Sequence, residues 1–179
     1  ATTDRLTGIP NRPAILASLF NEVERAGRYD RPLAVAFVDI DLFKSVNDTF
    51  GHLTGDNVLE VVAQVLSDGS RPTDVVGRYA GDEFVVLLPD TGALDAQGIC
   101  DRLRDAVGQR RIPVRGAEER WVGVSLSIGV AVAPGNGASF EDLFASADRA
   151  LYEAKRRGRN TVAVADGDGE AGKPRLNIQ

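Results

Sequence analysis

The sequence predicts an α+β fold, in which helices pack on one mixed central β-sheet. Three observations lead to this class. Nearly continuous apolar runs at 33–40 and 125–133 have the composition of strands that are covered on both faces. Segments with apolar residues at helical spacing alternate with these runs. Residues 75–88 form two short apolar runs around a tight turn, which is the pattern of a β-hairpin.

Length and composition limit the function classes. The chain of 179 residues fits one domain, expected at 1–165, and the glycine-rich stretch 166–179 is predicted to be a disordered tail. A net charge of −5 argues against a nucleic-acid polymer as partner. His52 is the only histidine and Cys100 the only cysteine, so a metal here would be hard and oxygen-bound, and a reducing compartment is the simplest setting. No apolar run approaches the ~20 residues of a membrane span.

Four helices are predicted from apolar periodicity and end signals. Asn11 is the expected N-cap of the first helix and Ser139 that of the last, which ends before Gly158. The segment Phe43–Gly55 is expected to be a polar connector, and Gly129 indicates a close approach of another element to its strand. The expected helices are 13–28, 57–69, 94–107 and 140–157, with a minor hairpin at 112–124 and a closing strand at 161–165.

Acidic side chains stand at two points of the predicted sheet. Asp39 ends a buried strand, and Asp82 and Glu83 lie in the hairpin turn. If these strands are neighbours, Asp39 and Asp82 can share one cation, and Mg²⁺ fits best because it needs few carboxylates and keeps water and phosphate ligands. The alternative for the turn is an ordinary acidic surface loop. Asp41 is interpreted as a cap of the following turn.

Cations and polar side chains near these acids allow a phosphate-bearing ligand. Lys44, Lys155 and Arg159 are candidates for contacts to a triphosphate. By residue type alone, Asn47 and Asp56 are turn and cap residues. The basic end of the last helix is equally explained by pairing with the helix dipole. Residue types therefore support a metal–nucleotide site and leave the base and the reaction open.

Motifs spread from Asp4 to Val164 make the sequence recognisable, because they occur together in one order and at matching spacing. The chain resembles the GGDEF family of diguanylate cyclases, whose signature stands here as Ala-Gly-Asp-Glu-Phe at 80–84. The matching segments are Asp4-Arg-Leu-Thr-Gly-Ile-Pro-Asn-Arg12, Phe37-Val-Asp-Ile-Asp-Leu-Phe-Lys44, Asn47-Asp-Thr-Phe-Gly-His52, Gly55-Asp56, Arg78-Tyr-Ala-Gly-Asp-Glu-Phe84, Ser127-Ile-Gly-Val130 and Ala150-Leu-Tyr-Glu-Ala-Lys-Arg-Arg-Gly-Arg-Asn160.

The resemblance implies a ferredoxin-like fold, as in nucleotidyl cyclases and polymerase palms. It also implies that two GTP molecules are condensed to cyclic di-GMP, with release of pyrophosphate, across a homodimer. By position, the Mg²⁺ ligands (Mn²⁺ being a possible substitute) are Asp39, the Ile40 carbonyl and Asp82, and Glu83 adds metal binding or helps to deprotonate the 3′-hydroxyl. Asn47 and Asp56 match guanine-binding positions, and Lys44, Lys155 and Arg159 match phosphate contacts, with Lys44 grouped with the catalytic residues.

The resemblance further implies an inhibitory product site at Arg71 and Asp74, with Arg102 as a second contact. Arginine suits this role because its guanidinium binds phosphate bidentately and stacks on bases. One departure is Ala80, which replaces the first signature glycine, and its methyl group is a source of crowding or strain at the turn. Because the acids, Gly81 and the base and phosphate positions are kept, we expect activity to survive.

Two alternatives to an active cyclase follow from the same residues. A degenerate module would hold GTP or cyclic di-GMP and signal through a partner, and Ala80 motivates this reading. A different nucleotidyl cyclase or palm enzyme is disfavoured by Asp56, which does not suit ATP. Family members usually carry an N-terminal sensory or receiver domain, so such a domain is expected to be missing from this chain, and the location is expected to be cytoplasmic.

Overall fold

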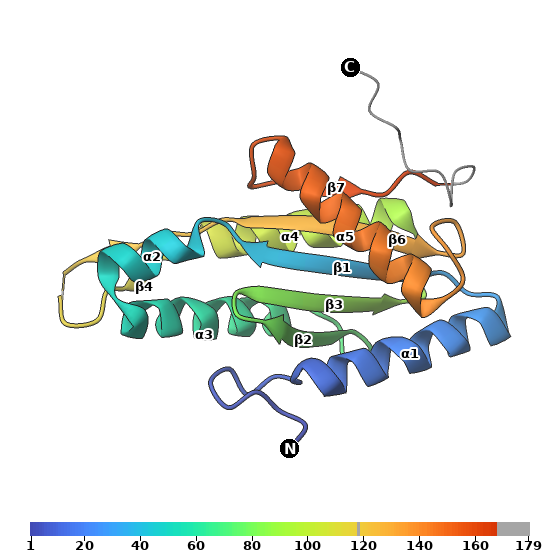
Figure 1. The fold of residues 1–179 in the computed structure, drawn as a ribbon, viewed down its shortest axis with the longest axis horizontal. Coiled ribbons are helices and arrows are strands. Elements are labelled where there is room, and N and C mark those ends of the chain that lie inside the picture. The colour runs from blue at the N-terminus through green and yellow to red at the C-terminus, as the bar shows by residue number, and fades with distance from the viewer. Residues whose placement is uncertain (118, 168–179) are drawn as a thin grey trace.

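The computed structural model describes residues 1–117 and 119–167. Its main sheet has five strands in the order β2-β3-β1-β6-β7 (Figure 1). All neighbours are antiparallel except β6 and β7, which run parallel, so the predicted mixed sheet is confirmed. The strands are β1 (Leu33–Ile40), β2 (Val75–Ala80), β3 (Glu83–Pro89), β6 (Leu126–Ala133) and β7 (Val162–Val164), and a separate pair consists of β4 (Ile112–Pro113) and β5 (Trp121–Val122).

Helices cover both faces of this sheet. On one face, α1 and α5 pack against alternate residues of β1 such as Val35, and on the other face α3 and α4 pack against residues such as Ala36. Because β1 is buried along its whole length, its sequence is a continuous apolar run. In chain order β1, α3, β2, β3, α4 and β6 form the β-α-β-β-α-β arrangement of ferredoxin-like folds. The helices are α1 (Arg12–Tyr29), α2 (Phe43–Phe50), α3 (His52–Asp68), α4 (Ala93–Gly108) and α5 (Phe140–Arg156).

The predicted N-caps are confirmed. Asn11 Oδ1 accepts a hydrogen bond from the Ala14 amide at 3.1 Å, and Ser139 Oγ accepts one from the Asp142 amide at 3.1 Å. Each bond satisfies a backbone N–H that has no partner inside the helix. Gly158, at φ 107°, follows α5 in the left-handed half of the map, as expected of a glycine after a helix end.

The prediction that Phe43–Gly55 is a polar connector is wrong, because this segment forms α2 and the start of α3. Its few apolar residues, Phe43, Val46 and Phe50, recur at helical spacing and pack on the core that α3 covers. Gly51, at φ 87°, separates the two helices. Asn47 and Asp56 therefore lie inside α2 and α3 and are neither turn nor cap residues.

Gly129 lies where α5 crosses β6, and the close approach predicted from the sequence is confirmed. A Cβ at this position would lie 2.1 Å from the Leu151 amide nitrogen and 2.4 Å from the Ala147 carbonyl oxygen. Both atoms belong to helix backbone, which cannot rotate away as a side chain can.

We therefore expect Gly129→Ala to lower the free energy of unfolding by about 3 kcal/mol, the upper end of the usual cost of overpacking. Urea unfolding followed by circular dichroism measures this change. Gly27→Ala is the matched control, because a Cβ at that α1 position meets no atom within 4 Å and alanine favours helix. Equal stability of Gly129→Ala and the parent would contradict the packing described.

Two further expectations concern the C-terminal tail and membrane-spanning helices. The tail predicted at 166–179 lies, apart from residues 166 and 167, outside the described residues. Among the helices of the described residues, none is long and apolar enough to cross a membrane.

Candidate active site

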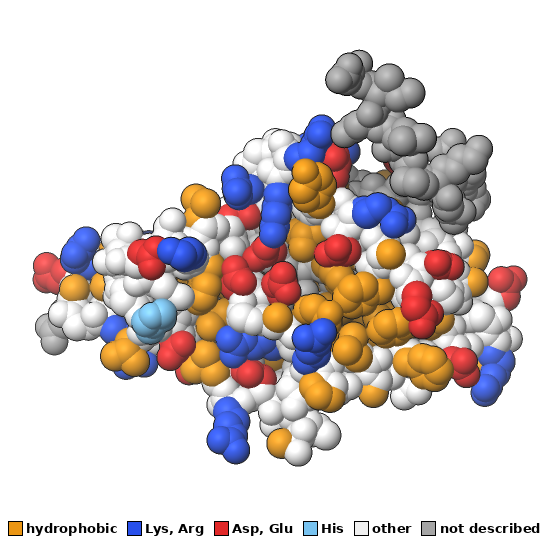
Figure 2. Space-filling model, in the orientation of Figure 1, with side chains coloured by type: hydrophobic (Ala, Val, Ile, Leu, Met, Phe, Trp, Pro, Cys, Tyr) orange, Lys and Arg blue, Asp and Glu red, His pale blue; other side chains and the backbone are white. Residues whose placement is uncertain are grey.

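The two acidic points of the sheet meet at one place. β1 and β3 are antiparallel neighbours with Asp39 opposite Glu83, and the Ile40 amide donates to the Asp82 carbonyl at 3.2 Å. The turn between β2 and β3 therefore folds over the end of β1. Figure 2 shows acidic side chains gathered over this end, with basic side chains beside them at the C-terminal end of α5. The adjacency on which the proposed shared cation depends is thus present.

The electrostatics of the pair suit a cation. Asp39 is 8% exposed, and its Oδ1 is buried with no hydrogen-bond partner among the described residues. Burial, followed by the negative charge of Asp39, raises the pKa of Asp82 from 3.8 to about 6. Two carboxylates that repel each other and one oxygen without a partner fit a hard divalent ion, which takes oxygen ligands. In the described residues no group of three His, Cys, Asp or Glu side chains is arranged to hold a metal. Mg²⁺ is usually bound by one or two carboxylates and keeps water and phosphate oxygens as its other ligands.

The three candidate phosphate cations differ in their contacts. Lys155, near the end of α5, forms an ion pair with Asp39 Oδ2. Arg159 is exposed in the turn after α5 at φ 64°. Lys44 is exposed on α2 and donates to Asp48 Oδ2 at 2.8 Å, a bond that raises the lysine pKa. Lys155 is therefore in direct contact with the acidic pair, whereas Lys44 and Arg159 face solvent.

The candidate guanine residues stand on adjacent helices. Asn47 projects from α2 against α3, and its Oδ1 is buried without a hydrogen-bond partner among the residues described. A Cβ on Gly55 would lie 1.9 Å from this oxygen, so the glycine makes the space that the amide occupies. Asp56 follows Gly55 directly and is half-buried. Asn47 and the residue next to Gly55, Asp56, are thereby brought to adjacent helices, although the sequence placed Gly55 in a connector and gave no sign of this space.

Gly55→Ala tests whether this space matters for the ligand. The methyl group would displace the Asn47 amide, while alanine favours the helix by about 1 kcal/mol over glycine. If the chain binds GTP, as the resemblance implies, we expect its KM for GTP to rise roughly tenfold, because one lost hydrogen bond costs about 1.4 kcal/mol, and we expect no loss of thermal stability. Steady-state kinetics and thermal unfolding measure the two effects.

Gly98→Ala is the matched control for this change, since Gly98 is also a helical glycine and a Cβ there meets nothing within 4 Å. Its KM should equal that of the parent. An unchanged KM in Gly55→Ala would show that the position of the Asn47 amide does not matter for binding of the base.

Arg78 is a site residue to which the sequence assigned no role. Its Nε donates to the Gly81 carbonyl at 2.9 Å, and its Nη1 donates to both oxygens of Asp4 at 3.2 Å. Asp4 also accepts from the Thr7 hydroxyl at 2.7 Å. Burial alone would raise the pKa of Asp4, but the bonds from Thr7 and Arg78 outweigh it and lower the pKa. Arg78 thus ties the hairpin turn to the N-terminal segment.

The turn itself is unstrained. Ala80 is exposed, and its φ lies outside the left-handed region, so the methyl group carries no backbone penalty. Gly81 does not adopt a positive φ either. A Cβ on Gly81 would meet nothing within 4 Å, so the space above this residue is open. The strain suggested for Ala80 is therefore absent.

The candidate inhibitory residues Arg71 and Asp74 follow the end of α3, and Arg71 reaches the end of β3. Arg71 Nη2 donates to Asp74 Oδ1 at 2.8 Å, to Thr91 Oγ1 at 2.9 Å and to the Pro89 carbonyl at 3.2 Å. The side chain of Asp74 is only 1% exposed, and its bond raises the pKa of Arg71. Arg102 is exposed on α4, one residue before Leu103, which packs on Gly69. Asp74 thus fixes the orientation of a half-exposed guanidinium.

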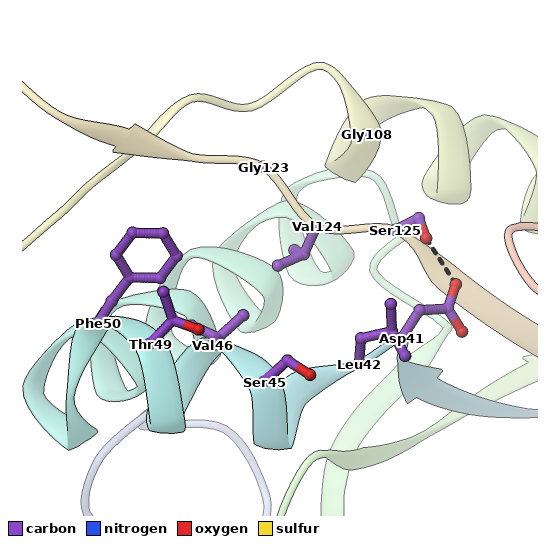
Figure 3. Close-up of a pocket in the computed structure, with 10 residues that line it drawn as sticks. All are labelled: Asp41, Leu42, Ser45, Val46, Thr49, Phe50, Gly108, Gly123, Val124 and Ser125. Carbon is purple, nitrogen blue, oxygen red and sulfur yellow. Dashed lines mark hydrogen bonds between the residues drawn. The ribbon is translucent and has the colours of Figure 1, made fainter.

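A hollow in the described part of the chain lies next to Asp41, at the end of β1. It measures about 380 Å³ and opens between α2, the end of α4 and residues 123–125 (Figure 3). Ser45, Val46, Thr49 and Phe50 of α2 line it, so it lies on a different face of α2 from Asn47. Asn47 and Asp56 are not among the residues that line it.

The structure is a ferredoxin-like domain with two acidic side chains at one end of its sheet, and comparison with known proteins identifies its family. The family model described as "Diguanylate cyclase, GGDEF domain" matches residues 1–161. The chain belongs to the GGDEF family. It is 42% identical over 165 residues to diguanylate cyclase DgcP of Pseudomonas aeruginosa, covering 92% of this chain and 24% of the relative. It is also 42% identical over 162 residues to the response regulator PleD of Caulobacter vibrioides, covering 90% of this chain and 36% of that protein.

A solved structure agrees with this assignment. The GGDEF domain of DgcB from Caulobacter crescentus, determined in complex with c-di-GMP, superposes with a TM-score of 0.86 at 35% identity. The match covers 92% of this chain and 95% of that one. The ferredoxin-like GGDEF fold expected from the resemblance is therefore confirmed. The chain spans only about a quarter to a third of the length of DgcP and PleD.

Proposed function

We propose that residues 1–165 form a diguanylate cyclase domain that condenses two GTP molecules to cyclic di-GMP. The observation that carries the proposal is the convergence of Asp39, which has a buried oxygen without a partner in the described residues, with Asp82, whose pKa is raised. Membership of the GGDEF family supplies the substrate class. The diguanylate cyclase relative and the cyclic di-GMP complex of the DgcB domain support the product.

In the proposed reaction, the 3′-hydroxyl oxygen of one GTP forms a bond to the α-phosphorus of the other. The bond from that phosphorus to the β-phosphate oxygen breaks, and pyrophosphate leaves. The hydroxyl proton passes to a base, for which Glu83 is the candidate because it lies opposite Asp39. Repetition of the step with the roles exchanged closes the ring and releases the second pyrophosphate.

Different residues of the chain would bind the metal, the phosphates and the guanine base. Asp39, the Ile40 carbonyl and Asp82 would hold Mg²⁺, or Mn²⁺ in its place, and the bound ion would offset phosphate charge and acidify the hydroxyl. Lys44, Lys155 and Arg159 would contact phosphates. Asp56 and Asn47 would accept from and donate to the guanine edge. Because Lys155 is paired with Asp39, binding of a cation there would release its ammonium group toward the phosphates.

Two regulatory features belong to the same proposal. A homodimer would bring two such sites together, since each subunit holds one GTP. Cyclic di-GMP would bind at Arg71, with Arg102 as a second contact. The hydrogen bond from Arg71 to Asp74 supports this role, because a guanidinium that is already held in place loses less conformational entropy when a ligand binds. The response-regulator relative supports control by a further domain.

Incubation with GTP and Mg²⁺ over a range of protein concentrations tests the proposal. Chromatography should detect cyclic di-GMP, and its rate of formation should rise more than linearly with protein concentration. If GTP binds but no product forms at any concentration, the degenerate binding module becomes the correct description. The unstrained geometry of Ala80 weighs against that outcome.

A further inference from the structure

Asp41 is a buried carboxylate that the proposed reaction does not use. It is 8% exposed, and its two oxygens accept three hydrogen bonds from the protein. Oδ1 accepts from Ser127 Oγ at 2.6 Å, and Oδ2 accepts from Ser125 Oγ at 2.6 Å (Figure 3) and from the Asn160 amide at 3.0 Å. Bonds this short between hydroxyl and carboxylate are charge-assisted and strong.

These contacts correct the interpretation of Asp41 as a cap of the following turn. The N-cap position of α2 is Leu42, with no side-chain hydrogen bond, and Asp41 faces β6 and the segment after α5. Its own amide donates to the Ser125 carbonyl at 2.9 Å. Asp41 therefore fastens the end of β1 to two segments that are distant in sequence.

The more distant of these segments is the turn that carries Arg159. Arg159 and Asn160 have consecutive positive φ values of 64° and 47°. Asparagine tolerates this region, but arginine adopts it only where the surroundings enforce it. The enforcing bonds run from the Asn160 amide to Asp41, from the Arg159 amide to the Ala154 carbonyl at 3.2 Å, and from Arg104 Nη1 to Asn160 Oδ1 at 2.9 Å.

We propose that Asp41 is a positioning residue, which holds the turn after α5 so that Arg159 is aimed at the nucleotide phosphates. This inference rests on the phosphate role proposed for Arg159. Asp41 stands two residues after Asp39, so one short segment would fix both the metal-binding carboxylate and, through Asn160, a phosphate-binding guanidinium. A residue that only stabilised the β1–β6 pair would have no such link to Arg159.

The test is a double-mutant cycle in nucleotide affinity, measured by calorimetry with Mg²⁺ and a non-hydrolysable GTP analogue. Asp41→Ala should weaken binding about tenfold, as loss of one charge-assisted phosphate contact does. In the Arg159→Ala background the same change should alter affinity less than about twofold. Equal losses in both backgrounds would reduce Asp41 to a structural residue and overturn the proposal.

Two further variants guard against a general loss of folding. Asp41→Asn can turn its NH₂ toward the Ser127 hydroxyl and keep its carbonyl for Asn160, so it should recover most of the affinity. Asn136 is a matched control, because it is also 8% exposed and bonds the Val132 amide at 2.8 Å near the other end of β6. Asn136→Ala should lower the melting temperature and leave nucleotide affinity unchanged.

Amide hydrogen exchange separates this proposal from the proposed function. The Asn160 amide should be protected in the parent and in Asp41→Asn, and should exchange faster in Asp41→Ala. If the parent bound no nucleotide, the proposed function would fail, and exchange would still decide whether Asp41 holds the turn. Unchanged protection of Asn160 in Asp41→Ala would refute the positioning role.

Discussion

Asp82→Asn is expected to slow turnover severely and, at the same time, to stabilise the metal-free protein above pH 6. The amide keeps the shape of the side chain but removes one of the two charges proposed to hold the metal. A metal contributes several kcal/mol to the transition state, so we expect the rate to fall by a factor on the order of 1,000.

The stability effect follows from the raised pKa of Asp82, which lies near 6 in the folded protein against 3.8 in the reference state. Between these values the folded state binds more protons than the unfolded state, so stability falls as pH rises through this window. Above pH 6 the charged carboxylate opposes folding in full. Asparagine carries no such charge, and its advantage should grow from pH 3.8 to 6 and then stay constant.

Thermal unfolding in a chelator across this pH range, together with cyclic di-GMP formation at neutral pH, measures both effects. Asp148→Asn is the control, because Asp148 is an exposed carboxylate on α5. It should leave activity and the pH dependence as in the parent. An Asp82→Asn protein that retained turnover, or one that was destabilised at neutral pH, would contradict the assignment of Asp82 to a charged, metal-binding pair.

Asp56→Ala is expected to remove most of the preference for GTP over ATP. A carboxylate accepts hydrogen bonds from both N1–H and the N2 amino group of guanine, and adenine offers neither pattern. Sites built around such bonds reject the wrong ligand by factors of about 10⁴. Loss of the carboxylate should therefore lower kcat/KM for GTP by about 100- to 1,000-fold and leave the low value for ATP almost unchanged.

Steady-state rates with each nucleotide, at equal Mg²⁺, measure this ratio. Glu60→Ala is the matched control, since Glu60 is an exposed acid one helical turn further along α3. Its GTP-to-ATP ratio should equal that of the parent. If Asp56→Ala kept the full preference for GTP, base recognition would have to reside elsewhere.

The buried strands and the acids at their ends could be predicted from the sequence because these signals are local, whereas the adjacency of Asp39 and Asp82 was only a condition of the prediction. The continuous apolar run of β1 follows from burial on both faces, and the antiparallel pairing of β1 with β3 places Asp39 beside Asp82. The resemblance supplied the base and phosphate positions, which residue types alone left open. Asn47 and Asp56 had been interpreted as turn and cap residues, and the structure places them in adjacent helices.

Other features depend on contacts between distant segments and were not predictable in this way. Helix α2 is short and polar, and it is stabilised by packing of Phe43, Val46 and Phe50 against the core. The role of Asp41 depends on Asn160, which is 119 residues further along the chain. The space that Gly55 leaves for Asn47 becomes visible only when the two helices pack.

The most direct test of the account is the location of the metal. A crystal structure with Mn²⁺ and a non-hydrolysable GTP analogue would place the ion by anomalous scattering. We predict a peak about 2.0–2.2 Å from oxygens of Asp39, Asp82 and the Ile40 carbonyl, with Lys155 released from Asp39 toward phosphate. A metal bound elsewhere, with the ion pair of Asp39 and Lys155 intact beside a bound nucleotide, would contradict the account.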